Sequence, residues 1–484
     1  MRMRMAVTDA VDTSREPERA RVSGPRTRVA GVDVARGLAI LGVFIAHMGV
    51  PLAAFLAPTA DLADPAVYVD HAAEGFGGTV VSWVGTAVSG RSAALFSFLA
   101  GLSLVLVAGR TRPGTREDRN RIRVKVAVRA ILLIALGYAL ATLGSLAVIL
   151  HFYGLFFLLA IPLLWLRIRH LLAVGAAVLL IGPQAALVPY VSEYLPWSEG
   201  GYSSGLEAGS DAEWEEWDAK WEEKWDDPEW VAEQEAKWEE EPVDKPLFDV
   251  DYLETPLDLV LLGIYPAVVF MAYVIAGMVV GRLDLRALRT RLWLLGGGVA
   301  MAVVGYGTSW LLLNPFSGVL PGDENLYAQL FAAYSHSNTT LEVVGNTGVA
   351  VAVLGLCLLV ADRARILLYP LAAAGAMTLT LYAVHGIGLW ALFHVPTDTG
   401  WGEFLATYTV EIFFLVALVA APLWRRFLGA GPMERPLTWT ANTVSRRLVP
   451  TPTAAVHGHA DPPGPAHDPG PGRSPDGAAS PDDR

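Results

Sequence analysis

The chain has 484 residues, of which 53% are apolar and only 17% are charged. Soluble globular proteins usually carry about a quarter charged residues, so this balance disfavours a cytosolic enzyme. The apolar content excludes disorder over most of the chain, and the single cysteine, Cys357, excludes a disulfide framework and a cysteine-based zinc site.

The net charge of −12 comes from one segment of the chain. Residues 211–251 contain eighteen Asp and Glu against four Lys, a net charge of −14, so the rest of the chain is close to neutral. The acidity therefore gives no indication of a nucleic-acid partner, and none is expected.

Ten apolar runs are long enough to cross a membrane, which takes about 20 mostly apolar residues. In chain order they are roughly 32–55, 91–109, 127–147, 148–166, 171–194, 257–280, 292–313, 342–361, 366–392 and 404–424. The third and fourth are continuous, with a turn expected near Gly144 to Val148. The sequence therefore predicts an all-α polytopic membrane protein in contact with the lipid bilayer, a bundle of about ten transmembrane helices with an acidic outer insertion.

Lys and Arg concentrate in alternate connections between these runs. Basic residues occur in 1–28, 110–125, 167–169, 282–291, 363–365 and 425–426, whereas 56–90, 314–341 and 393–403 contain none. Because positive loops stay on the inner side, both termini are predicted to be cytoplasmic in the plasma membrane. No small-residue cleavage site follows the first run, so it is not a removable signal peptide.

Three segments lie outside the helical pattern. Residues 1–28 form a basic arm and residues 429–484 a cytoplasmic tail rich in Pro and Gly towards its end, and both are expected to be largely disordered. The outward insertion 196–256 spaces four tryptophans by 3, 4 and 4 residues along one helix face: Trp214, Trp217, Trp221 and Trp225. It is either a solvated acidic insertion or a lid over the outer mouth of the bundle.

Ionisable residues at membrane depth are functional candidates, because burying charge in lipid is expensive. Asp33 and Arg36 lie near the inner end of the first run, and His47 follows Arg36 by eleven residues. That spacing is about 16 Å along one helix face. At the same outer level the sequence places Arg91, His151, His336, His385 and Glu411. Each also has a structural interpretation as a helix–helix bond, ion pair or interfacial anchor, and Arg129 is expected to snorkel to the inner surface.

Several motifs are absent from the sequence. It contains no Walker-type phosphate loop, no His-Glu-x-x-His pair and no Gly-x-Ser-x-Gly nucleophile elbow. No metal site is expected, and any chemistry should depend on histidine as a general base.

Five segments in order carry a family resemblance: "DVARGLAILGVFIAH", "GRSAALFSFLAGLSL", "LHFYGLFFLLAIPLL", "HSNTTLEVVGNTGVAVAVLGLCLLVA" and "GAMTLTLYAVHG". They resemble actinobacterial membrane proteins grouped with the heparan-α-glucosaminide N-acetyltransferases, within a wider superfamily of transmembrane acyltransferases. The resemblance covers roughly 29–428 without the acidic insertion. Arg36 and His47 match the Arg and catalytic His of the O-acyltransferase branch. In the heparan-modifying branch the catalytic His follows helix one, where the nearest counterpart, His71, matches less well.

The resemblance implies transfer of an acyl group, with acetyl as the expected group, from cytosolic acetyl-CoA to a hydroxyl or amine of an outward-facing glycan or cell-envelope acceptor. Arg36 and Asp33 would bind the donor, and His47, Arg91 and His151 would act in catalysis. Acetyl-CoA is then a substrate, and no permanently bound cofactor is expected. The sequence is compatible with either a monomer or a homodimer. Two alternatives remain: a secondary transporter with a relay through His47, Arg91 and Glu411, and a non-catalytic scaffold. The lack of an internal repeat counts against transport.

Overall fold

The computed structural model describes residues 29–52, 75–109, 115–144, 146–191, 255–315, 324–395 and 399–450. Within these ranges every regular element is helical, which confirms the all-α prediction. The helices are α1 (Ala30–Met48), α3 (Gly75–Val88), α4 (Arg91–Ala108), α5 (Arg116–Ala141), α6 (Leu150–Ala160), α7 (Ile168–Val191), α10 (Ala267–Val280), α11 (Leu288–Leu313), α12 (Glu324–Phe331), α13 (Thr340–Val360), α14 (Tyr369–Gly375), α15 (Thr378–Phe393), α16 (Gly400–Thr407), α17 (Thr409–Leu415), α18 (Ala421–Phe427) and α19 (Glu434–Leu448).

Six of the described helices are long and apolar enough to cross a membrane, or eight if each of two bent pairs is one span. The bent pairs are α14 with α15, at 78°, and α16 with the helices that follow it, at 67°. The predicted runs 148–166 and 257–280 correspond to shorter helices, Leu150–Leu163 and Ala267–Val280. The count of ten spans is therefore not confirmed. The turn predicted near Gly144 is present between α5 and α6, with Gly144 at a φ of 61°.

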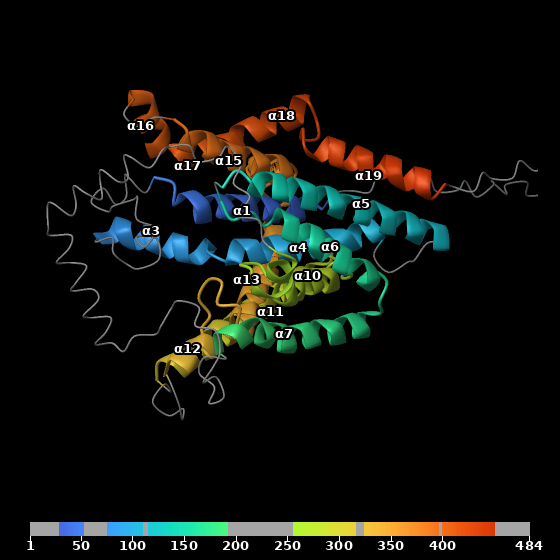
Figure 1. Ribbon diagram of the computed structural model, residues 1–484, viewed down its shortest axis with the longest axis horizontal. Helices are drawn as coiled ribbons and strands as arrows, with labels where there is room; N and C mark the ends of the chain where they lie inside the picture. The colour runs from blue at the N-terminus through green and yellow to red at the C-terminus, as the bar shows by residue number, and fades with distance from the viewer. Residues whose placement is uncertain are drawn as a thin grey trace, which may run out of the picture.

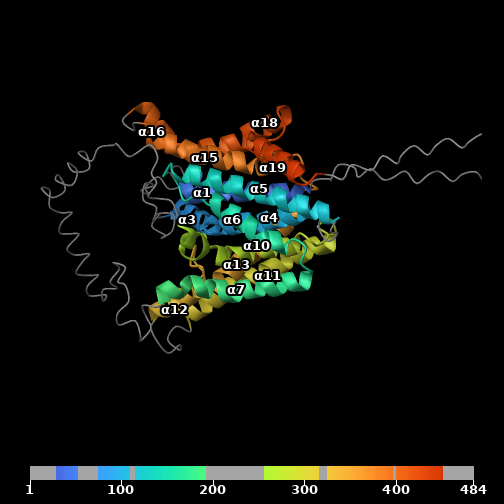
Figure 2. The same cartoon turned by 45° about the vertical axis from the view of Figure 1, so that its right-hand side comes forward.

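The helices stack in layers around a buried centre. Figure 2 shows α15 and α19 on one outer side, α7 and α11 on the other, and α1, α4, α6 and α10 between them. Close approach of the central helices depends on glycine. A Cβ at Gly277 of α10 would collide with the Phe98 carbonyl of α4, and one at Gly375 of α14 would collide with the Asp33 carbonyl of α1. The small-residue pair Gly277 and Gly281 therefore serves helix packing.

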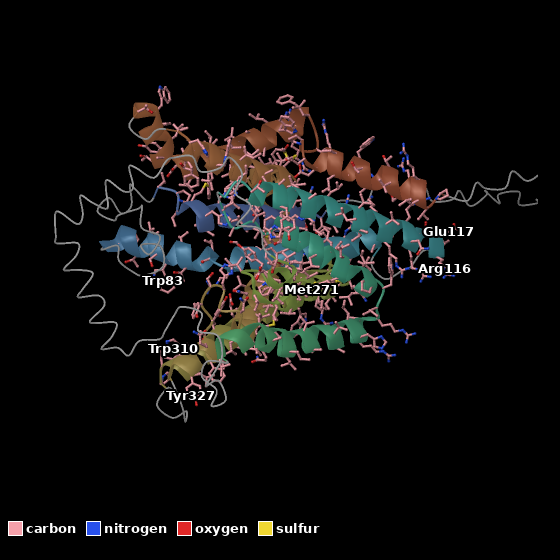
Figure 3. The ribbon with its side chains drawn as sticks, viewed as in Figure 1. Trp83, Arg116, Glu117, Met271, Trp310 and Tyr327 are labelled. Atoms are coloured by element: carbon pink, nitrogen blue, oxygen red, sulfur yellow. The ribbon has the colours of Figure 1, made fainter. Side chains whose placement is uncertain are left out.

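The basic connections contact one another in pairs at one end of the bundle. Arg282 donates to the carbonyl of Leu164 between α6 and α7, Arg291 pairs with Asp362 at 2.8 Å, and Arg121 donates to the Val449 carbonyl after α19. In Figure 3 Arg116 lies at this end, and the exposed Trp83 and Trp310 lie towards the opposite end. Exposed tryptophans also occur near the basic end, at Trp293 and Trp439, and basic loops on one side with tryptophans near both boundaries are typical of a membrane-spanning bundle.

The predicted insertion and the two predicted disordered ends are only partly covered by the described residues. The acidic insertion with its four tryptophans, the basic arm 1–28 and residues 451–484 lie outside the described residues. Residues 434–448, within the tail expected to be largely disordered, form α19, which lies along α5 (Figure 1). Its apolar residues are too few for a membrane span, but Ala441 and Ser445 are buried against the bundle.

Candidate functional site

A cavity of about 1320 Å³ runs lengthwise through the bundle. Helix α4 lines it from Ser92 to Val107, a rise of about 22 Å at 1.5 Å per residue. Its wall also contains residues of α1, α5, α6, α14, α15 and α19. We call the end lined by His47 and His336 the histidine end, and the end lined by Arg36, Arg129, Arg425 and Arg435 the arginine end.

The histidine end is organised by a pair of histidines from α1 and α15. Nδ1 of His47 lies 3.3 Å from Nε2 of His385, and the two rings are stacked with an interplanar angle of 2°. His385 is fully buried and packs against Phe44 and Phe413. His47 lines the cavity, whereas His385 does not. His385 therefore orients the His47 ring from the side that faces away from the cavity.

His336 reaches the same end of the cavity from the loop between α12 and α13. Both His336 and Asn338 adopt positive φ, 63° and 54°, which is unusual for residues other than glycine. The buried carboxylate of Glu342 holds this loop by accepting hydrogen bonds from the backbone N–H groups of His336 at 3.0 Å and Asn338 at 2.7 Å. Burial lowers the pKa of His336 below its usual range. A neutral imidazole at pH 7 can accept a proton.

Tyrosines line the cavity next to its histidine end, where Tyr265 packs against His336 and Tyr382 against His385. The Tyr382 hydroxyl accepts a hydrogen bond from the Ile149 N–H at 3.1 Å, and the Tyr153 hydroxyl lies 3.3 Å from the Ala93 carbonyl, to which it donates. Both rings and that of Tyr265 border the cavity. Between the tyrosines and the arginine end the lining is mostly apolar, with Leu99, Leu104 and Leu133 among its residues, and it suits an extended and weakly polar chain.

The arginine end carries a local excess of positive charge. Arg36 donates to Asp33 at 3.3 Å and also to the Ser103 hydroxyl of α4. Arg129 lies in the cavity wall with its Nε buried and without a hydrogen-bond partner among the described residues. The lining contains four arginines and one carboxylate, Glu434. Such an end attracts anions.

The structure brings some of the predicted site residues together and separates others. His47, His336 and Arg36 line the cavity, and His385 and Asp33 contact two of them. The remaining candidates do not line it: His151, Arg91 and Glu411. His71 lies outside the described residues.

The three candidates that do not line the cavity, His151, Arg91 and Glu411, each contact another residue of the bundle. His151 is fully buried, and its ring stacks on Tyr138 at 4.8 Å. Arg91 donates to the Tyr306 hydroxyl at 2.9 Å and lies over that ring. Glu411 accepts from the Leu52 N–H at 2.8 Å. Arg91 therefore bonds to α11, while its chain neighbours Ser89, Gly90 and Ser92 line the cavity.

Sequence reasoning missed the contribution of Tyr382 and of α19. Tyr382 precedes His385 by three residues, so both lie on neighbouring positions of one helix face. Arg435, Trp439 and Asn442 of α19 line the arginine end. Their spacing of four and three residues, which places them on one face of a helix, is the sequence feature that could have predicted this. Within the described residues no group of three or more His, Cys, Asp or Glu side chains could hold a metal ion.

Comparison with known families matches two parts of the chain. Residues 28–199 match a model described as heparan-alpha-glucosaminide N-acetyltransferase, catalytic. Residues 286–442 match a model described as protein of unknown function (DUF418). The first contains His47 and Arg36, the second contains His336, His385 and Arg435, and the cavity lies between the two parts. A search of curated proteins returned no match.

The apolar helices and the family match together indicate a multi-pass membrane protein, and residues 28–199 are similar to the catalytic part of an acetyltransferase family. No comparison supports the transporter alternative. The resemblance to the heparan-α-glucosaminide N-acetyltransferase-like family, predicted from the motifs, is confirmed.

Proposed function

We propose that this protein transfers an acyl group, most simply acetyl, from cytosolic acetyl-CoA to a hydroxyl or amine of an outward-facing glycan or cell-envelope acceptor. The observation that carries the proposal is that arginines lie at one end of the cavity and His47 at the other. Coenzyme A pairs a polyanionic nucleotide with a long, weakly charged arm. Its two parts correspond to the arginine end and to the mostly apolar stretch of the cavity that leads from there to the histidine end.

The proposed orientation places the arginine end at the cytoplasm and the histidine end at the outer surface of the plasma membrane. The basic connections that contact one another at the arginine end support it, because positive loops stay inside. Coenzyme A would then stay on the cytoplasmic side. The rise of about 16 Å from Arg36 to His47 is close to the length of an extended pantetheine arm.

The reaction uses His47 as a general base. Its Nδ1 faces His385, which leaves Nε2 for the acceptor. The acceptor oxygen or nitrogen forms a bond to the thioester carbonyl carbon while its proton moves to Nε2. The carbon–sulfur bond then breaks, and the leaving thiolate takes a proton to give free coenzyme A. Arg36, oriented by Asp33 and Ser103, binds the donor.

A test compares His47→Ala with His394→Ala in purified protein. His394 is an exposed histidine of the α15 end, bonded to the Trp390 carbonyl at 2.7 Å and outside the cavity lining, so its loss is a matched control. Coenzyme A release from acetyl-CoA is followed with a thiol reagent while glucosamine and neutral sugars are offered as acceptors. Removing a general base lowers the rate by about 10²–10⁴-fold.

We expect that loss for His47→Ala, with an unchanged melting temperature, and wild-type turnover for His394→Ala. Turnover by His47→Ala at the wild-type rate would refute its role. Absence of acceptor-dependent coenzyme A release in the wild-type protein, with both sugar classes and with extracted cell-envelope glycan, would refute acyl transfer itself.

A further inference from the structure

Helix α19 is fixed to the bundle at both ends, although it follows the last apolar helix. At its start Glu434 accepts hydrogen bonds from the Thr380 N–H at 3.1 Å and the Thr380 hydroxyl at 2.5 Å, near the first turn of α15. At its end the Arg121 guanidinium of α5 donates to the Val449 carbonyl at 2.9 Å. The helix between these anchors therefore has a defined position along α5 (Figure 1).

This position places one face of α19 on the arginine end of the cavity. Arg435, Trp439 and Asn442 all line the cavity and follow one another by four and three residues. Trp439 is 69% exposed although it borders the cavity. An exposed indole beside an arginine offers a flat apolar surface next to a positive charge.

Helix α5, which packs beside α19, contributes Arg129 to the same end of the cavity. Its Nε is buried and has no hydrogen-bond partner among the described residues. A buried, unsatisfied guanidinium N–H is unfavourable unless a ligand accepts its hydrogen bond. Lysine or arginine that snorkels to the membrane surface, as the sequence predicted for Arg129, keeps its charged head in water. Arg129 lines the cavity, and its buried Nε is the group that needs an acceptor there.

We propose that α19 and Arg129 form a nucleotide subsite at the arginine end, in which Arg129 and Arg435 bind phosphate groups and Trp439 stacks on the base. Arginine binds phosphate oxygens through two parallel N–H groups, and aromatic side chains stack on bases whatever their sequence. The subsite rests on the proposed function, since the nucleotide is then the adenosine 3′,5′-bisphosphate part of the acyl donor. It assigns a donor-binding role to the carboxyl-terminal helix, outside the residues matched to the acetyltransferase model.

The test measures binding of adenosine 3′,5′-bisphosphate to the full-length protein in detergent by isothermal titration calorimetry. Arg435→Gln and Trp439→Leu change exposed side chains of α19, so folding should be preserved. Arg447→Gln is the matched control, because Arg447 is exposed on the same helix but does not line the cavity. Arg129→Gln is measured as well, with its melting temperature as a check on folding.

We expect Arg435→Gln and Trp439→Leu each to weaken binding about tenfold, the effect of one lost charged hydrogen bond or stacking contact. Arg447→Gln should bind as the wild type does, and acetyl-CoA should compete with the bisphosphate. Equal affinity in wild type, Arg435→Gln and Trp439→Leu, or the absence of competition, would overturn the subsite. Because binding is measured without turnover, an inactive protein that binds the bisphosphate as expected contradicts only the proposed acyl transfer. An active protein with unaltered variant affinities contradicts only the subsite.

Discussion

Replacing Glu342 should destabilise the loop that carries His336. The carboxylate accepts four hydrogen bonds: from the backbone N–H groups of His336 and Asn338 at 3.0 and 2.7 Å, from the Ser337 hydroxyl at 3.1 Å and from the Asn346 amide at 3.1 Å. A typical hydrogen bond contributes about 1 kcal/mol net. Glu342→Ala removes all four, so the free energy of unfolding should fall by about 4 kcal/mol.

Glu342→Gln gives a sharper test, because it keeps the shape and replaces one acceptor by a donor. An amide nitrogen at Oε1 would face the His336 N–H, and one at Oε2 would face the Asn338 N–H. The Ser337 hydroxyl can rotate to accept, but a backbone N–H cannot. One buried donor then stays unsatisfied, which costs about 1–3 kcal/mol. The loss for Gln should therefore lie between those of wild type and Ala.

The assay is unfolding of the purified protein by sodium dodecyl sulfate added to a mild detergent, followed by circular dichroism. Glu117→Gln provides the control, since Glu117 is an exposed carboxylate in the first turn of α5. Wild-type stability of Glu342→Ala, or an equal loss for Glu117→Gln and Glu342→Gln, would refute the reasoning that the buried acceptor holds the loop.

Three further predictions follow from the site and the packing. Arg36→Ala should raise the KM for acetyl-CoA, with Arg36→Lys intermediate because a point charge lacks the planar fork; steady-state kinetics would contradict this if only kcat fell. Gly277→Val should abolish the folded, monodisperse protein in gel filtration, because even a Cβ collides with the Phe98 carbonyl, whereas Gly307→Val, where a Cβ meets open space, should be recovered normally. Burial lowers the pKa of His336, so the unfolded state binds more protons near pH 6 and stability should fall as the pH drops below about 6.5. In His336→Gln the fall in melting temperature from pH 7 to pH 5 should be smaller, and an unchanged fall would exclude this contribution.

The apolar runs determined the class of this protein from sequence alone. Long stretches without charge cannot be solvated, and lipid leaves the backbone no partner but its own helix. Helix starts were less well determined. The sequence predicted that the third span starts at residue 127. Helix α5 begins earlier, at Arg116, because Thr115 and Asp118 form a capping box at its polar first turn. Hydropathy also overlooked α19, because a surface helix needs only one apolar face.

The sequence also determined which ionisable residues lie at similar depth, because depth follows from position along a helix. It could not determine which of them face the cavity. His47 and His151 were equivalent by depth, yet His47 lines the cavity while His151 stacks on Tyr138. The rotation of each helix about its axis decides this, and it is set by contacts between elements far apart in the chain. Gly137 shows such a contact: only a residue without a Cβ lets α5 lie against the backbone of His151, whose ring stacks on the neighbouring Tyr138.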